Sequence, residues 1–185
     1  VFPTSEEQVK PKSFYAISKY CIHHFAKSYK QYYGLDTIAL RYFNVYGPRQ
    51  DYRRSFPPVI VSFIMSMLKG ERPVIYGDGT KKRDFVYIDD INHFHKLIIT
   101  EERALNKIFN LGYGKNYSVY DLYLEIEAIL KTGLKPIYKD NLPGETQENL
   151  ADITRVQNLG WKPEFDIADG LIKSIKYIKQ NVLNV

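Results

Sequence analysis

The chain has 185 residues, of which 44% are hydrophobic and 25% charged, values typical of a globular domain that exclude intrinsic disorder. Its net charge of +5 comes from scattered lysines and arginines, so we expect no nucleic-acid partner. The single cysteine, Cys21, excludes an internal disulfide and a metal site of the zinc-finger type. No apolar run approaches the about 18 residues of a membrane span, and the first residues do not resemble a secretory leader. We therefore expect a cytoplasmic chain without membrane contact.

Hydrophobic periodicity and turn residues predict helices that alternate with strands along the chain. After a loop over 1–12, apolar residues at three- and four-residue steps predict a helix over 13–33, which Gly34 ends. The predicted strands are 37–41, 74–76, 83–87, 107–111 and 134–138. The other predicted helices are 57–69, 89–102 with Asp89 as cap, 119–131 with Ser118 as cap, 154–159 and 167–181. The alternation predicts an α/β fold with parallel strand pairing, interrupted by a long loop over 42–55.

Tyr15 and Lys19 stand four residues apart on the first predicted helix. They share one face of it, with Cβ atoms about 5–6 Å apart. A nearby ammonium favours the ionised form of a phenol, and such a phenol can take and return a hydroxyl proton. Because the chain contains 16 tyrosines, this spacing alone also arises by chance.

The histidines do not predict a metal site. His23 and His24 are adjacent, and His93 and His95 stand two residues apart on a predicted helix. Residues at such spacings point to different faces of a helix. We therefore expect no bound metal.

Several segments in fixed order resemble a known enzyme family. They are YAISK at 15–19, RYFNVYGPRQ at 41–50, IYGDG at 75–79 and RDFVY at 83–87. Shorter matches follow at 109–112, 143–145, 151–152 and 159–161. Together they resemble the nucleotide-sugar epimerases and dehydratases of the extended short-chain dehydrogenase/reductase family, most of all the UDP-glucose 4-epimerases. The resemblance extends over nearly the whole chain.

The resemblance implies an incomplete doubly wound, Rossmann-like parallel sheet with a small α/β substrate domain. Residues 1–55 and 83–105 would belong to the NAD-binding domain, and 56–82 and 106–185 to an interleaved nucleotide-sugar domain. The glycine-rich turn with which the family binds the NAD pyrophosphate does not occur in this sequence, nor does the family's catalytic Ser or Thr. We therefore expect this chain to be the C-terminal three-fifths of a longer enzyme, inactive by itself.

The resemblance also implies the chemistry. Tyr15 would take the proton of the C4 hydroxyl of a nucleotide-linked hexose while NAD accepts hydride, and Lys19 would hold the nicotinamide ribose. Tyr42 would contact the cofactor and line the sugar pocket. The implied substrate contacts are Asn44, Val59, Val74, Tyr76, Arg83 and Glu145. A homodimer is implied as well, through a pair of helices that includes the one carrying Tyr15.

One position departs from the family. Three residues before the acidic Glu145, the epimerases commonly carry an arginine on the substrate phosphate, whereas this chain has Leu142. We consider Lys82 and Lys139 as substitutes, although a lysine is a point charge and not a fork. Two alternative functions stay open: an NDP-sugar 4,6-dehydratase or UDP-glucuronate decarboxylase, and an inactive nucleotide-sugar binding fragment.

Overall fold

The computed structural model describes residues 2–184. Helices and strands alternate along the chain, as the sequence predicts. The strands are β1 (Ala39–Tyr42), β2 (Asn44–Tyr46), β3 (Val74–Tyr76), β4 (Lys82–Tyr87), β5 (Ile108–Leu111), β6 (Asn116–Ser118) and β7 (Ile137–Lys139). The helices are α1 (Phe14–Tyr33), α2 (Val59–Leu68), α3 (Ile88–Ile98), α4 (Val119–Leu130), α5 (Thr154–Gln157) and α6 (Ile167–Ile178), with a 3-10 turn η1 (Glu102–Ala104) and a π-helical turn η2 (Lys179–Leu183).

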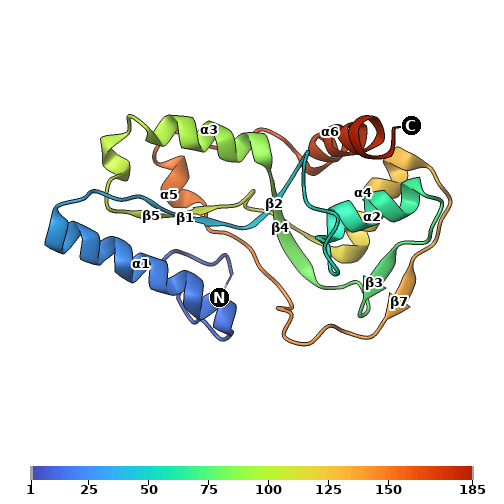
Figure 1. Cartoon of the computed structure of the whole chain (residues 1–185), viewed down its shortest axis with the longest axis horizontal. Coiled ribbons are helices and arrows are strands. Elements are labelled where there is room, and N and C mark those ends of the chain that lie inside the picture. Colours follow the sequence, from blue (N-terminus) through green and yellow to red (C-terminus); the bar gives the residue numbers. More distant parts are fainter. Residues whose placement is uncertain (1, 185) are drawn as a thin grey trace.

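Within the described residues the strands form three small sheets, spread along the length of the molecule (Figure 1). β1 pairs with β5 and β3 pairs with β7, both in parallel. In the third sheet, β4 pairs with β2 in parallel on one side and with β6 in the antiparallel sense on the other. The predicted α/β fold with parallel pairing is confirmed.

The predicted loop over 42–55 is wrong in its first part, because Asn44–Tyr46 forms β2. This strand pairs with β4 in the register Asn44 to Phe85 and Tyr46 to Tyr87. Such a long-range partner cannot be recognised from the loop-like composition of the segment. Between β1 and β2 stands Phe43, whose N–H donates to the Leu111 carbonyl at 2.9 Å. The chain therefore passes from one sheet directly into the next.

Other predicted elements differ in their bounds, and one strand was not predicted. The helix predicted over 89–102 is α3, which begins at Ile88 and ends at Ile98, so Asp89 lies in its first turn and is not its cap. The strand predicted over 134–138 begins only at Ile137, whose N–H bonds to Pro73, because Pro136 has no N–H to donate. β6 is an additional strand. It ends at Ser118, which caps α4 in a capping box, as predicted for that residue.

Two hydrophobic clusters form the core. The first joins α2, α4 and α6 to β3, with Phe63, Ile64, Ile75, Leu122 and Leu171 among its buried members. The second lies under α3 and contains Val86, Phe94, Phe109, Val156 and Trp161. The prediction assigned α3 to the NAD-binding domain and residues 106–185 to the nucleotide-sugar domain. In this second cluster Phe109, Val156 and Trp161 pack with α3. The domain bounds themselves stay a prediction.

α1 is a helix over the predicted range, with Ser13 as N-cap and Gly34 in the left-handed conformation after it. All its residues are exposed or half-buried. The apolar side chains that predicted the helix are largely exposed: Phe14 is 94% exposed and Phe25 65%. A polar contact, from Arg41 Nη2 to His23 Nδ1 at 3.1 Å, joins α1 to β1. Among the described residues, none of the helices has the length and apolar character that crossing a membrane requires.

Candidate active site

Six residues predicted to contact a substrate line one cavity of about 660 Å³. They come from five separate segments and are Asn44 of β2, Val59 of α2, Val74 and Tyr76 of β3, Arg83 of β4, and Glu145 of the loop after β7. A volume of this size falls within the range of small-molecule sites, roughly 300–1,000 Å³. The structure therefore brings together all of the predicted substrate contacts.

The pleat of β3 and the rigid start of α2 shape the apolar walls. Successive strand residues point to opposite faces, so Ile75 is fully buried in the core while Val74 and Tyr76 face the cavity. On the opposite side, Pro57 and Pro58 precede α2 and line the cavity together with Phe56. This part of the lining is therefore mostly apolar.

The charged side of the cavity is built by the segment that enters β4. Lys81 and Arg83 line the cavity, whereas Lys82 between them is exposed, which is the alternation of a strand. Arg83 Nη1 donates to the carbonyls of Lys82 at 2.9 Å and Gln147 at 3.4 Å. Burial lowers the pKa of Arg83 and Glu145 opposes that shift, but a guanidinium stays charged at any physiological pH. These bonds use one nitrogen of its five-donor fork, so donors remain for a ligand.

Lys81 and Glu145 form an ion pair across the cavity. The lysine side chain is 8% exposed and the carboxylate 34%. Leu142 lies in the same wall, where the family commonly has an arginine. Among the described lining residues, Lys81 is the lysine at the site, and the two substitutes suggested by the sequence, Lys82 and Lys139, are not among them.

Asn44 is held by the protein itself. Its Nδ2 donates to the Asp84 carbonyl at 2.8 Å and to Asn149 Oδ1 at 3.2 Å. A side-chain amide has two N–H donors, so both are used here. A hydrogen bond donated by Asn44 to a substrate would require one of these contacts to be released.

Asp84 fixes the segments around Asn44. Its buried carboxylate accepts N–H bonds from Tyr113 at 2.6 Å, Gly114 at 3.1 Å and Ala151 at 3.0 Å. Burial raises the pKa of Asp84, although these bonds act in the opposite direction. Gly112 is required beside it, because a Cβ there would lie 2.7 Å from Asp84 Oδ2. The sequence singled out Asp84 as part of a motif without giving it this role.

The residues predicted for catalysis and cofactor binding lie elsewhere. Tyr15 is 72% exposed, and Lys19 Nζ is 5.4 Å from the centre of its ring. The Tyr42 hydroxyl and His95 Nε2 are 2.8 Å apart, and burial raises the pKa of Tyr42. The described residues that line the cavity do not include these three side chains. Figure 1 shows the start of α1, which carries the Tyr15–Lys19 pair, at the end of the helix nearer the middle of the molecule.

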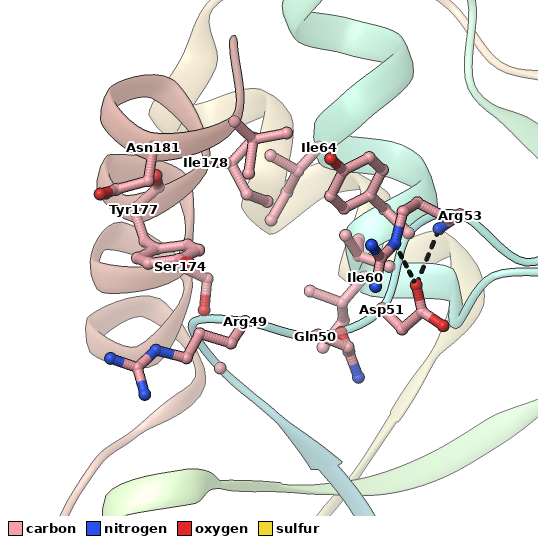
Figure 2. Close-up of a pocket in the computed structure, with 14 residues that line it drawn as sticks. Arg49, Gln50, Asp51, Arg53, Ile60, Ile64, Ser174, Tyr177, Ile178 and Asn181 are labelled. Carbon is pink, nitrogen blue, oxygen red and sulfur yellow. Dashed lines mark hydrogen bonds and ion pairs between the residues drawn. The ribbon is translucent and has the colours of Figure 1, made fainter. Parts of the chain in front are cut away.

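A second cavity of about 260 Å³ lies between the 47–53 segment, α2 and the end of the chain (Figure 2). It contains two arginines, but neither is offered to a ligand. Arg53 is turned to Asp51, at 3.3 Å from Nε to Oδ1, and Figure 2 shows the Arg49 guanidinium extending away from the middle of the cavity. The larger cavity is therefore the better candidate for an anionic ligand.

Within residues 2–184 there is no group of three or more His, Cys, Asp or Glu side chains that could hold a metal ion. The histidines have other neighbours. His23 contacts Arg41, His95 contacts Tyr42, and His93 lies 3.9 Å from Glu164.

The sequence reasoning missed Lys81 and the segment Arg54–Phe56, which also line the cavity. A signal for Lys81 was present. In a strand, residues two apart share a face, so Lys81 falls on the side of Arg83 and Lys82 on the other. No comparable signal marks Arg54–Phe56, because a loop has no period.

Comparisons with known proteins identify the family. The family described as the NAD dependent epimerase/dehydratase family matches residues 2–112. A relative from Methanocaldococcus jannaschii, provisionally named UDP-glucose 4-epimerase, is 37% identical over 94% of this chain and 55% of its own length. A dTDP-glucose 4,6-dehydratase from Streptomyces griseus is 32% identical over 94% of this chain and 52% of its own length. The chain thus spans about half the length of these relatives.

Solved structures show the same fold. The UDP-glucose 4-epimerase of Thermotoga maritima, solved with UDP-glucose, has a TM-score of 0.93 at 34% identity, over 98% of this chain and 59% of its own. The UDP-glucuronic acid 4-epimerase of Bacillus cereus, solved with UDP-glucuronic acid and NAD, has a TM-score of 0.88 at 30% identity, over 96% of this chain and 56% of its own. The predicted Rossmann-like class of α/β fold is confirmed by these neighbours.

Proposed function

The chain belongs to the NAD-dependent epimerase/dehydratase family, and from that premise we propose that the complete protein inverts C4 of a nucleotide-linked hexose through a transient 4-keto sugar. The observation that carries the proposal is the convergence of six predicted substrate contacts on one cavity of about 660 Å³. UDP-glucose and UDP-galactose are the substrates we propose first, since relatives of this chain are named for UDP-sugars.

The exposed Tyr15–Lys19 pair fits the family's cofactor. A phenol and an ammonium on one open face of α1 can hydrogen-bond the hydroxyl groups of a ribose, and Tyr42 lies at the end of the adjoining strand. NAD, when bound there, supplies the acceptor and donor of hydride. Tyr15 holds the proton of the C4 hydroxyl at its phenolic oxygen and returns it after the sugar has turned over. Lys19 holds the hydroxyl groups of the nicotinamide ribose.

The cavity residues and the Tyr15–Lys19 pair have different roles in this proposal. The cavity binds the nucleotide and diphosphate, and the sugar extends from it toward Tyr15. Asn44 lines the cavity, and only one residue separates it from Tyr42. This closeness supports a single ligand that extends from the cavity to the region of Tyr42 and Tyr15. Inversion at C4 requires the sugar to turn while its anchor stays fixed, so firm binding belongs at the diphosphate and loose contact at the hexose.

The alternatives use the same core. A 4,6-dehydratase is among the relatives of similar identity, and a UDP-glucuronate decarboxylase would share the tyrosine and lysine pair. An inactive binding fragment would keep the cavity and lose turnover. We expect the 185-residue chain alone to show no turnover and not to retain NAD.

The test is a product assay with the purified full-length protein. UDP-galactose and NAD⁺ are incubated with it, and NMR follows the nucleotide sugar. Formation of UDP-glucose is the expected result. A 4-keto-6-deoxy product would identify a dehydratase, and release of CO₂ from UDP-glucuronate a decarboxylase. Binding of the nucleotide sugar without any product would favour a protein that binds nucleotide sugars and is catalytically inactive.

We also propose a homodimer and a cytoplasmic location. The dimer is supported by the apolar stripe on α1, whose members Phe14, Ile17 and Phe25 are all exposed. A cytoplasmic location is consistent with a single cysteine, since disulfides mark oxidising compartments. Sedimentation of the full-length protein tests the first, and fractionation of the source cells the second.

A further inference from the structure

We propose that Lys81 supplies the second cation to the substrate diphosphate. It would replace the arginine that the family commonly has at the position of Leu142. The inference rests on the proposed function, because it takes the ligand to be a nucleoside diphosphate. It adds a specificity-determining residue that neither the family pattern nor the sequence reasoning assigns.

The burial of Lys81 is the first reason. The residue is 7% exposed, and lysines are almost never buried without a partner. Its partner is Glu145, a loop residue whose side chain is 34% exposed. Even a paired ammonium is costly to bury, because desolvation can exceed the gain from the ion pair, so Lys81 is a poor choice for stability alone.

The charge of the cavity is the second reason. Its lining cations are Arg54, Lys81 and Arg83, and its one carboxylate among the described residues is Glu145. Arg54 lies 3.6 Å from Asp51 and has 60% of its side chain exposed, so solvent screens much of its charge. Without Lys81, the charge of Arg83 would be cancelled by Glu145, and a doubly charged diphosphate would meet a neutral wall. With Lys81, the two cations exceed the one carboxylate and the wall carries a net positive charge.

An exchange of partners follows. On binding, Lys81 leaves Glu145 for oxygens of the diphosphate, and the released carboxylate becomes free to accept a hydrogen bond from a ribose hydroxyl, as suits a residue predicted to contact the substrate. The segment 143–147 around Glu145 lies outside the helices and strands, so this carboxylate can turn without disturbing the core.

The experiment separates the diphosphate from the nucleoside. In the full-length protein, UDP and uridine are titrated calorimetrically into the wild type, Lys81→Gln and the neighbouring control Lys82→Gln. We expect Lys81→Gln to weaken UDP binding by about tenfold or more, as charge-assisted hydrogen bonds do, while uridine binding stays within about twofold. Lys82→Gln should bind both ligands as the wild type does, because Lys82 is exposed and outside the cavity.

A second set of variants keeps the test valid if Lys81→Gln folds poorly. Lys81→Gln with Glu145→Gln removes the ion pair without leaving an unpaired charge, and it is compared with Glu145→Gln alone. Adding Leu142→Arg to Lys81→Gln should restore UDP affinity, since both positions line one cavity. An unchanged Kd for UDP in Lys81→Gln, or equal losses for UDP and uridine, would overturn the proposal, the latter by showing that Lys81 only positions Glu145.

Failure of the two proposals can be told apart. A wild-type protein that binds UDP without epimerising UDP-hexoses contradicts the proposed function, while the response of Lys81→Gln still decides the role of Lys81. A protein that epimerises normally and binds UDP equally well as Lys81→Gln contradicts the role of Lys81 alone. A wild type that binds no nucleoside diphosphate contradicts both.

Discussion

Helices α1 and α2 have similar apolar side chains and opposite surroundings. α2 has ten residues, of which Ile60, Val61, Phe63, Ile64 and Met67 are buried against α4 and α6. α1 is twice as long, and all of its residues are exposed or half-buried. Apolar periodicity predicted both helices correctly, but whether a face is buried depends on what packs against it. The comparison shows that the larger cavity stands on a packed core and the proposed catalytic pair on an open helix.

This difference in packing matches the two proposed roles, ligand binding at the cavity and chemistry at α1. A cavity supported by a packed core is held in shape before a ligand arrives, and α2 gives it Val59 as well as the core residue Phe63. The Tyr15–Lys19 pair lies on a surface where a cofactor or a second chain can still be added. Binding should therefore depend on one region and chemistry on the other, and four predictions test that division.

The largest effect is expected at Tyr15. Tyr15→Phe removes the proton-transfer group with little change in volume, so kcat of the full-length protein should fall by about 10²–10⁴-fold. UDP binding should stay unchanged, since Tyr15 is outside the cavity. Tyr29→Phe is the matched control on the same helix, where the tyrosine is also exposed, and it should leave kcat unchanged. Near-normal turnover of Tyr15→Phe would remove this residue from the chemistry.

The next effect concerns the two helices directly. Phe63 of α2 is 1% exposed and Phe25 of α1 is 65% exposed. Phe63→Ala should lower the free energy of unfolding by about 3–5 kcal/mol, because it leaves a cavity in the core. Phe25→Ala should change it by no more than about 0.5 kcal/mol, as surface substitutions do. Urea unfolding of both variants, at a concentration where the chain is monomeric, makes the measurement. Equal losses would mean that the α1 stripe is covered.

A smaller effect is expected at Arg83. Arg83→Ala in the full-length protein removes a charge-assisted donor from the cavity and should weaken UDP binding by about tenfold. kcat at saturating substrate should change less than the Kd, because the residue lies in the binding region. Arg103→Ala is the control, since that arginine is exposed and paired with Glu101. An unaltered Kd for Arg83→Ala would exclude Arg83 from the site.

The smallest effect is a pH dependence of the junction between α1 and β1. Burial, and then the charge of Arg41, lower the pKa of His23 below its ordinary value of 6.5, and His24 and Lys27 act in the same direction. The unfolded chain therefore binds more protons between the lowered pKa and pH 6.5. The stabilising contribution of His23 is full above about pH 6.5 and is lost as the pH falls through the folded value.

Hydrogen exchange of the α1 and β1 amides at pH 7.5 and 5.5, corrected for intrinsic rates, measures this loss. Protection should decrease a few-fold at the lower pH, and His23→Gln should abolish the difference because glutamine does not titrate. His93→Gln, on α3, is the control and should keep it. A pH response that survives His23→Gln would have to come from another group.

Much of the fold followed from local patterns, and the exceptions have physical causes. The bounds of α1 and of β3 were predicted closely because periodicity, capping residues and breakers mark them in the sequence. β2 was missed because its strand character comes from pairing with β4, forty residues away. The six substrate contacts came from the family resemblance, and their convergence was visible only in three dimensions. Lys81 was overlooked although strand alternation pointed to it, and the role of Asp84 was hidden because its partners are backbone groups distant in sequence.

The continuous run from β1 to β2 limits how the site can open. Hinges between the lobes of an enzyme are usually loop residues that absorb large changes in φ and ψ. Here the crossing is strand on both sides, and Phe43 between them is bonded to Leu111, so a rotation of one sheet is transmitted to the other. We therefore expect entry to the cavity to depend on the segment 47–58, which lies outside the helices and strands and contributes Gln50 and Arg54 to the lining, and not on a rotation between the two sheets.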